Sequence, residues 1–263
     1  MTQVDAHRLA DLVASAPSVD LADVEEHAAL LTRVDRKYAL DRVTAEAVVE
    51  RLVPRAAVMT VADGRTFWYR SVYFDTPDLE SYRRAATQRR LRWKVRTRSY
   101  VESGTTFVEV KQRGTRGVTE KQRISLPLDS TPEHLGPISC EWIDDTLARR
   151  GVGASLAPAC TTGYQRTTLV DLDSTTRATI DTSIVLGGAE TPELVIVEVK
   201  SPNGSSWFDR VLRDAGARPG SVSKFGLAMA ASHPELPANR WRRQVTRHLR
   251  VGAVSPSSAP AVR

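Results

Sequence analysis

Two short stretches of the sequence each place an acid and a base two positions apart. They are Glu109–Lys111 in TTFVEVKQRG and Glu198–Lys200 in ELVIVEVKSP. Because the side chains of a β-strand alternate between its faces, both charged residues of each stretch would share one face. Arginine and lysine bind phosphate oxygens, and carboxylates bind hard divalent cations. Each stretch is therefore either a solvated strand face or part of a metal–phosphate site.

The same pattern recurs in other strand-like segments, at 31–40, 89–100, 119–128, 161–172 and 175–187. Their opposite faces are largely apolar, as in Val195, Val197 and Val199. For one strand alone, the simplest interpretation is that the charges face solvent and the apolar side packs on a core. The charged or polar face residues of all these segments are Arg33, Asp35, Lys37, Arg92, Lys94, Arg96, Arg98, Glu109, Lys111, Lys121, Arg123, Tyr164, Arg166, Arg177, Thr179, Asp181, Glu198 and Lys200.

Considered together, these strands favour a different interpretation. An antiparallel sheet of about eight strands tends to close or to split into two layers. Helices expected at 41–54, 78–87, 141–151, 206–216 and 221–234 could cover its apolar face. We therefore expect an α+β protein, an eight-stranded antiparallel closed β-barrel with helices packed outside. Its charged interior would be unfavourable when dry, but reasonable around water, a polyanion and a divalent metal.

The sparse acids on these faces are the candidate metal ligands, namely Glu109, Asp181 and Glu198. Other catalytic motifs are absent from the sequence, which has no Gly-rich loop ending in Gly-Lys-Ser/Thr and no Gly-x-Ser-x-Gly. The abundant bases and few acids suit a metal-bound polyphosphate or nucleoside triphosphate.

Composition is consistent with an anionic partner, since the net charge is +6. The charge alone does not separate nucleic acid, a membrane surface and a phosphorylated small molecule. The sequence has no apolar run long enough to span a membrane and no secretory signal pattern. Its two cysteines, Cys140 and Cys160, indicate no disulfide framework, and we expect a cytoplasmic protein. The basic segment 239–250 could contact nucleic acid or a membrane, or could simply be a solvated helix.

Nine motifs in order resemble the VTC domain, the polyphosphate polymerase module of the vacuolar transporter chaperone family. They are RVDRKY, SVYFDT, RTRSY, FVEVKQR, TEKQR, GYQR, RATIDT, IVEVK and SVSKFG. The VTC domain belongs to the CYTH-like superfamily of triphosphate tunnel metalloenzymes. The resemblance covers roughly residues 30–232 and rests on the register of all the motifs, because none is specific alone.

The resemblance implies an eight-stranded tunnel that binds a nucleoside triphosphate or polyphosphate with a divalent metal, Mn²⁺ or Mg²⁺. It implies that Glu198 is the main metal ligand, with Glu109 and Asp181 nearby, and that Lys224 closes one end of the tunnel. The bases implied to act on phosphate are Lys37, Arg96, Arg98 and Lys200 as catalytic residues, and Lys111, Lys121, Arg166, Arg177 and Lys224 as binding residues.

Two departures from the family limit what the resemblance implies. Asp35 stands where the first strand commonly carries Glu, which puts a metal role for that position in doubt. The phosphate-sensing helical domain and membrane helices of the eukaryotic complex are not found in this sequence, so coupled translocation is not implied. We expect a helical lead-in at 1–30, the tunnel domain at 31–235, and a basic helix with a disordered tail at 236–263.

The functional hypothesis is a metal-dependent, polyphosphate polymerase-like phosphotransferase that uses a nucleoside triphosphate. Two alternatives remain open on the same fold: a tripolyphosphatase or nucleoside triphosphatase, and a non-catalytic polyphosphate or nucleotide sensor. Nucleic-acid binding through the basic surface is a further interpretation, although no nucleic-acid partner is expected. The sequence leaves the oligomeric state open.

Overall fold

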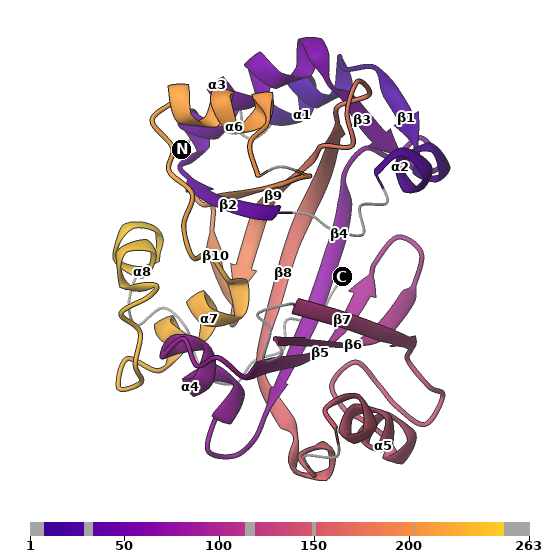
Figure 1. Ribbon diagram of the computed structural model, residues 1–263, viewed down its shortest axis with the longest axis vertical. Helices are drawn as coiled ribbons and strands as arrows, with labels where there is room; N and C mark the ends of the chain where they lie inside the picture. The colour runs from indigo at the N-terminus through magenta and orange to yellow at the C-terminus, as the bar shows by residue number, and fades with distance from the viewer. Residues whose placement is uncertain (1–7, 29–33, 114–118, 149–150, 203, 250–263) are drawn as a thin grey trace. The chain divides into compact units, whose positions relative to one another are not determined.

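The computed structural model describes residues 8–28, 34–113, 119–148, 151–202 and 204–249. Arg33 and the expected disordered tail lie outside these residues. The chain divides into two compact units (Figure 1). Unit 1 contains Met1–Phe67, Tyr164–Ile184 and Pro192–Val222, and unit 2 contains Trp68–Gly163, Val185–Thr191 and Ser223–Arg263.

The strands form one hydrogen-bonded path whose order departs from the sequence order. In order along the path, the strands are β2 (Val34–Leu40), β11 (Val195–Ser201), β9 (Arg177–Leu186), β8 (Ala157–Val170), β4 (Phe67–Asp75), β5 (Arg92–Tyr100), β6 (Thr105–Arg113) and β7 (Thr119–Ser125). Three short strands lie off this path: β1 (Ser18–Asp20), β3 (Ala57–Thr60) and β10 (Ala189–Thr191). The expected α+β class and antiparallel pairing are present, since β2–β11–β9 and β4–β5–β6–β7 pair antiparallel.

The expected eight strands are present along this path, but the expected closure into a barrel is wrong. Within the described residues the path ends at β2 and at β7 without a pairing that closes it. Both edge strands carry bases, Lys37 on β2 and Lys121 and Arg123 on β7. Charged side chains, lysine above all, keep an edge strand from accepting another strand.

In unit 1, helices cover the apolar face of β2, β9 and β11, as expected. The covering helices are α1 (Arg8–Ala14), α3 (Arg42–Leu52) and α6 (Trp207–Asp214), and they share one core with these strands (Figure 1). Helix α3 begins after Asp41, whose carboxylate accepts the backbone N–H of Thr44 at 2.8 Å. It ends at Leu52, before a 3-10 turn that contains Pro54.

A buried hydrogen bond fixes which face of β2 meets these helices. The Tyr38 hydroxyl donates to Asp209 Oδ1 at 2.7 Å, and Asp209 completes a capping box with Ser206 at the start of α6. Because Tyr38 points toward α6, its neighbour Lys37 points to the opposite face. The short helix α2 (Leu21–Ala28) follows β1 in the same unit.

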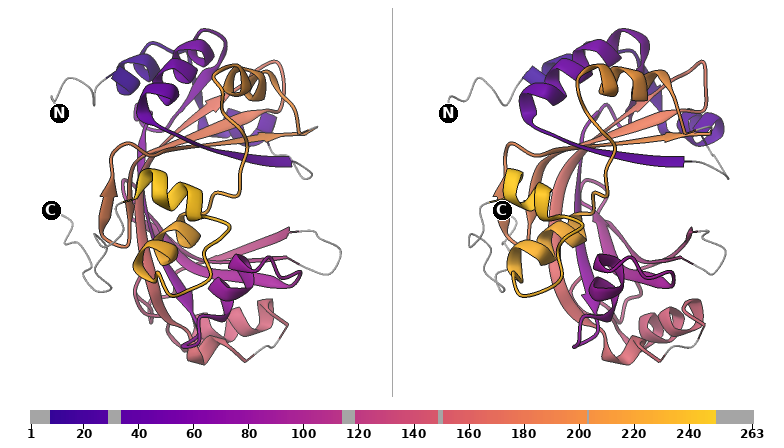
Figure 2. Two further views of the ribbon diagram at one scale, coloured as in Figure 1. Left: turned by 90° about the vertical axis from the view of Figure 1, so that its left-hand side faces the viewer. Right: turned by 60° about the vertical axis from the view of Figure 1, so that its left-hand side comes forward.

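In unit 2, α5 (Pro137–Thr146) packs on the apolar face of β5 and β6 (Figure 2). Val108 and Val110 of the opening stretch are buried with Ile143 of α5, which confirms that these valines face a covering helix. The helix begins at Pro137, four residues before the expected start, because proline is well suited to the first position of a helix.

The remaining helices of unit 2 are α4 (Glu80–Ala86), α7 (Lys224–Ser232) and α8 (Arg242–His248). Buried rings of Tyr82, Phe225 and Trp241 join them, with Tyr82 and Trp241 centroids 5.6 Å apart. None of the helices in the described part of the chain has the length and apolar character needed to cross a membrane.

Candidate phosphate-binding site

The face of β5, β6 and β7 opposite α5 is organised in rows of directly opposed residues. Arg96, Glu109 and Arg123 form one row, since Glu109 is the register partner of both arginines. Two residues along the strands, a row of three lysines forms: Lys94, Lys111 and Lys121. Side chains in one row lie on one face of a sheet. This face therefore combines one row that contains an acid, Glu109, with a second row that consists only of lysines.

Glu109 is the buried centre of this face, with its side chain 2% exposed. Arg96 donates from Nε to Glu109 Oε2 at 2.8 Å, and Lys121 Nζ donates to Oε1 at 2.5 Å. Burial alone would raise the pKa of Glu109, but Arg96, Arg98 and Lys121 outweigh it and lower the pKa to about 2. The carboxylate therefore stays ionised and holds its bases in fixed positions.

Arg98 lies in the next row and is 9% exposed. Its Nε is 4.0 Å from Glu109 Oε2 and has no hydrogen-bond partner within the described structure. The guanidinium group also lies over the Tyr69 ring of β4, 5.6 Å from the centroid. A buried charged donor without an acceptor costs free energy, which an anion at this position would recover.

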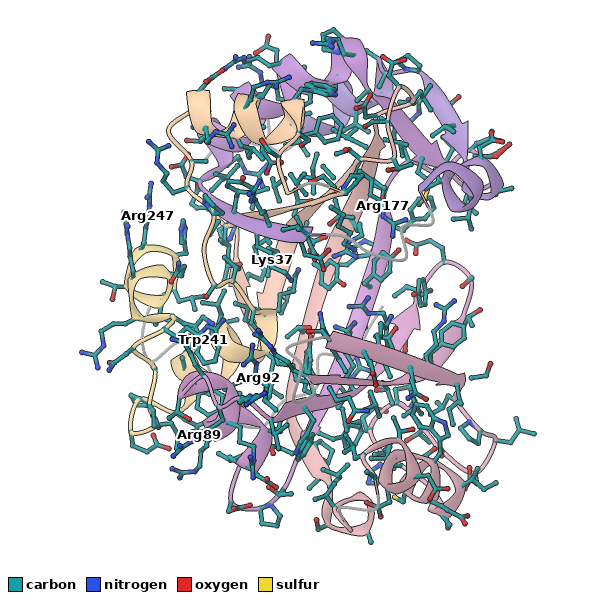
Figure 3. All side chains as sticks on the ribbon, in the orientation of Figure 1. Lys37, Arg89, Arg92, Arg177, Trp241 and Arg247 are labelled. Carbon is teal, nitrogen blue, oxygen red and sulfur yellow. The ribbon has the colours of Figure 1, made fainter. Side chains whose placement is uncertain are left out.

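In unit 1, the face of β2, β11 and β9 opposite the helices shows alternating charges. Lys37 pairs in register with Glu198, and Thr179 of β9 lies on the other side of Glu198. Lys200 lies between Asp35 and Arg177 in the next row. Figure 3 places Lys37 and Arg177 on the side of these strands away from α3 and α6.

Two further contacts define the electrostatics of this face. The guanidinium group of Arg166, on β8, makes a bidentate pair with the carboxylate of Asp181. The distances are 2.6 Å from Nε to Oδ1 and 2.8 Å from Nη2 to Oδ2. Burial would lower the pKa of Arg166, but Asp181 raises it well above its usual value. Burial lowers the pKa of Lys200 to about 8, with Arg166 and Arg177 lowering it and Glu198 and Asp35 raising it.

The acids of these two faces differ in how well they could serve as ligands for a divalent metal. Across residues 8–28, 34–113, 119–148, 151–202 and 204–249, no group of three or more His, Cys, Asp or Glu side chains is arranged to hold a metal ion. Asp181 uses both oxygens on Arg166, and Glu109 uses both on Arg96 and Lys121. Glu198 is more accessible, at 13% exposure, and is beside the buried Thr179 hydroxyl, which has no partner in the described structure. Carboxylate and hydroxyl oxygens fit a Mg²⁺ or Mn²⁺ ion whose other ligands are water and phosphate.

The predicted site residues are thus found on two strand faces, one in each unit. The unit 1 face contains Lys37, Arg166, Arg177, Lys200, Asp181 and Glu198, and the unit 2 face contains Arg96, Arg98, Lys111, Lys121 and Glu109. Lys224 is the first residue of α7, next to Ser223, whose hydroxyl accepts a hydrogen bond from Lys94 Nζ at 2.9 Å. The assigned roles in catalysis, phosphate binding and metal binding remain predictions.

Several residues of these faces have no role predicted from the sequence. Lys94 and Arg123 were placed on the right face but given no role. Tyr73 of β4 was overlooked, although its hydroxyl accepts a hydrogen bond from Arg96 Nη1 at 2.9 Å. The signal was present in FWYRSVYFD, where Tyr69, Ser71 and Tyr73 alternate along one face of the strand.

Comparisons with known proteins find similar folds among solved structures. HpAC1 from Hippeastrum, for which a dominant triphosphatase activity is described, has a similar fold with a TM-score of 0.54. The identity is 13%, over 80% of this chain and 100% of that chain. A Bacillus halodurans protein, bh2851, named as a candidate adenylate cyclase, gives a TM-score of 0.52. Its identity is 14%, over 73% of this chain and 94% of that chain.

These identities are low, so the two structures establish the similarity of fold alone. A search among curated proteins found no match. A family model described as the VTC domain matches residues 32–233, which is most of the chain. The chain therefore belongs to the VTC domain family.

Proposed function

We propose that this protein is a metal-dependent, polyphosphate polymerase-like phosphotransferase that takes phosphoryl groups from a nucleoside triphosphate. The observation that carries the proposal is Arg98, a buried arginine whose Nε lacks an acceptor on a face rich in bases. Glu109 neutralises only part of this charge. A chain of phosphates supplies several anionic oxygens in series, and membership of the VTC domain family supports that class of ligand.

The bases would act by position and charge rather than by covalent chemistry. Arg96 and Arg98 would offer planar donor groups to the phosphate chain, and Glu109 keeps Arg96 in a fixed orientation. Fixed donors of this kind stabilise the charge that develops on equatorial oxygens during phosphoryl transfer, without reorganisation at the moment of reaction. Lys37 and Lys200 would do the same on the unit 1 face.

Glu198 is the residue that we propose to hold the divalent ion. When bound, such an ion would neutralise charge on phosphate oxygens and thereby favour transfer. Lys37 Nζ lies 3.5 Å from Glu198 Oε2, so the same carboxylate also orients a base beside the phosphate position.

Hydrolysis of a triphosphate is the second candidate function. It is favoured by the similarity of fold to HpAC1, for which a dominant triphosphatase activity is described. The same bases could hold the substrate while water, instead of a growing polyphosphate end, accepts the phosphoryl group. The third candidate, a non-catalytic sensor, requires binding without turnover.

One assay separates these functions. The protein is incubated with ATP and Mn²⁺ or Mg²⁺, and both released phosphate and polyphosphate on a gel are measured. Polymer is the expected product, free phosphate without polymer identifies a hydrolase, and binding without either product identifies a sensor.

The metal assignment is tested with Glu198→Gln, and Glu193→Gln serves as the control because Glu193 is exposed just before β11. Glu198→Gln is expected to lower metal-dependent turnover, whereas Glu193→Gln is expected to retain it. Full metal-dependent turnover in Glu198→Gln would refute the assignment.

A further inference from the structure

The basic face of unit 2 continues one row beyond its three lysines. Arg92 and Arg113 are register partners at the ends of β5 and β6. They lie two residues along from Lys94 and Lys111, so they share the same face. A third arginine, Arg240, lies in the segment between α7 and α8, and its charge acts on both Arg92 and Arg113. Arg240 lies outside residues 32–233, the region that the VTC domain model matches.

A buried tryptophan holds Arg240 in place. The neighbouring Trp241 is 2% exposed and packs against Gly226 of α7, where an added Cβ would come within 2.4 Å of the indole. Arg240 Nη1 donates to the carbonyl of Ala85, in α4, at 3.3 Å. Arg92 and Trp241 lie in the same part of unit 2, around α4 and α7 (Figure 3).

Within the described residues, the three arginines have no acidic partner. The side-chain hydrogen bonds of Arg92 and Arg240 go to backbone carbonyls, from Arg92 Nη1 to Arg89 at 2.9 Å and from Arg240 to Ala85. Burial, followed by the charges of Arg113 and Arg240, lowers the pKa of Arg92. Like charges held together in partly desolvated positions raise the free energy of the folded protein unless an anion neutralises them.

We propose that Arg92, Arg113 and Arg240 form an anion site for the part of a polyphosphate chain that extends past the lysine row. Arg98 lies six positions after Arg92 on β5, which corresponds to about 20 Å along a strand. A short triphosphate can be bound entirely between the row that contains Arg98 and the lysine row. A longer phosphate chain extends beyond the lysine row and reaches Arg92, Arg113 and Arg240. The inference rests on the proposed function in one respect, namely that a phosphate chain binds along this face.

The test compares the affinities of the full chain for tripolyphosphate and for a long polyphosphate of defined length, by calorimetry without nucleotide or metal. The variant is Arg113→Gln, because Arg113 is exposed and makes no side-chain hydrogen bond within the described structure. The control is Arg243→Gln, which removes the same charge from an exposed position on α8. A second variant, Arg240→Gln, removes the arginine that lies outside the family match.

Wild type is expected to bind the long chain more tightly than tripolyphosphate. Arg113→Gln is expected to weaken long-chain binding about tenfold, the equivalent of roughly 1.4 kcal/mol for one charge-assisted hydrogen bond. The effect on tripolyphosphate should be clearly smaller, so the ratio of the two affinities falls. Arg240→Gln should act in the same direction, and Arg243→Gln should leave the ratio as in wild type.

Three results would overturn the inference. The first is a wild-type protein that binds both probes equally, and the second is an Arg113→Gln variant that keeps the wild-type ratio or matches Arg243→Gln. The third is a single-stranded oligonucleotide that binds as tightly as polyphosphate with the same dependence on Arg113, which would assign the site to nucleic acid. Because the readout is binding, a protein without turnover but with the expected ratio would refute the proposed function and leave this site standing.

Discussion

Replacing Glu109 by glutamine removes the one acid at the centre of the basic face of unit 2. The substitution keeps the size of the side chain but leaves Arg96, Arg98 and Lys121 without their shared counter-ion. These bases then repel one another in a partly buried site. We expect the variant to be less stable than wild type at neutral pH, because a buried ion pair that loses one partner leaves uncompensated charge.

The size of the effect follows from the pKa of Glu109, which is lowered from its usual 4.5 to about 2. A shift of about 2.5 pKa units corresponds to roughly 3 kcal/mol, at about 1.36 kcal/mol per unit. Because the folded-state pKa is depressed, this stabilisation is fully present above about pH 4.5 and is lost as the pH falls toward 2. The carboxylate is 2% exposed, so solvent screens little of it.

Urea unfolding of wild type and Glu109→Gln between pH 5 and pH 2.5 measures this contribution. The difference in unfolding free energy should be about 3 kcal/mol at pH 5 and should shrink as the pH falls. Glu120→Gln is the matched control, since Glu120 is an exposed residue of β7 whose side chain accepts a 3.4 Å hydrogen bond from Gln112. It should change stability by less than about 0.5 kcal/mol. Parallel pH profiles for wild type and Glu109→Gln would refute the reasoning.

Two further substitutions test other parts of the structure. Gly226→Ala should destabilise the protein by roughly 1–3 kcal/mol in thermal or urea unfolding, because its Cβ would lie 2.4 Å from the Trp241 ring. The control is Gly163→Ala, whose Cβ would meet no atom closer than 3.8 Å. Equal stability of the two variants would contradict this packing. Tripolyphosphate affinity should fall as the pH rises from 7 to 9, because Lys200, with a pKa of about 8, loses its proton in that range. Lys200→Arg stays protonated and should show a shallower pH dependence, and identical slopes in calorimetry would show that Lys200 does not contact the anion.

The sequence predicted which side chains share a strand face better than it predicted whether the sheet closes into a barrel. Alternation alone placed Glu109 and Lys111 on one face of their strand and Val108 and Val110 on the other face, because the period of a strand fixes which side chains share a face. The Asp41 cap of α3 was predictable for a similar reason, since it depends on local spacing. Whether β2 and β7 pair with each other depends on contacts far apart in the chain, and local patterns carry no information about them.

The partners of each charge were also beyond the sequence. Glu109 and Glu198 occupy identical Glu-Val-Lys stretches, yet Glu109 is enclosed by bases and Glu198 is the more accessible. The register between strands decides which charges surround each glutamate, and that register is set by the whole sheet. The role of Trp241 and Arg240 was hidden for another reason: they lie in a basic segment that reads as a solvated helix, while the glycine that accommodates the indole is fifteen residues earlier.

The central claim is that a phosphate chain binds the basic strand faces, and Arg98 tests it most directly. Tripolyphosphate affinity is measured by calorimetry for wild type and for Arg98→Lys, which keeps the positive charge but removes the buried Nε donor. The expected result is a loss of about 10- to 100-fold, the equivalent of one or two charge-assisted hydrogen bonds in a buried site. Wild-type affinity in Arg98→Lys, with the fold intact by circular dichroism, would contradict the account.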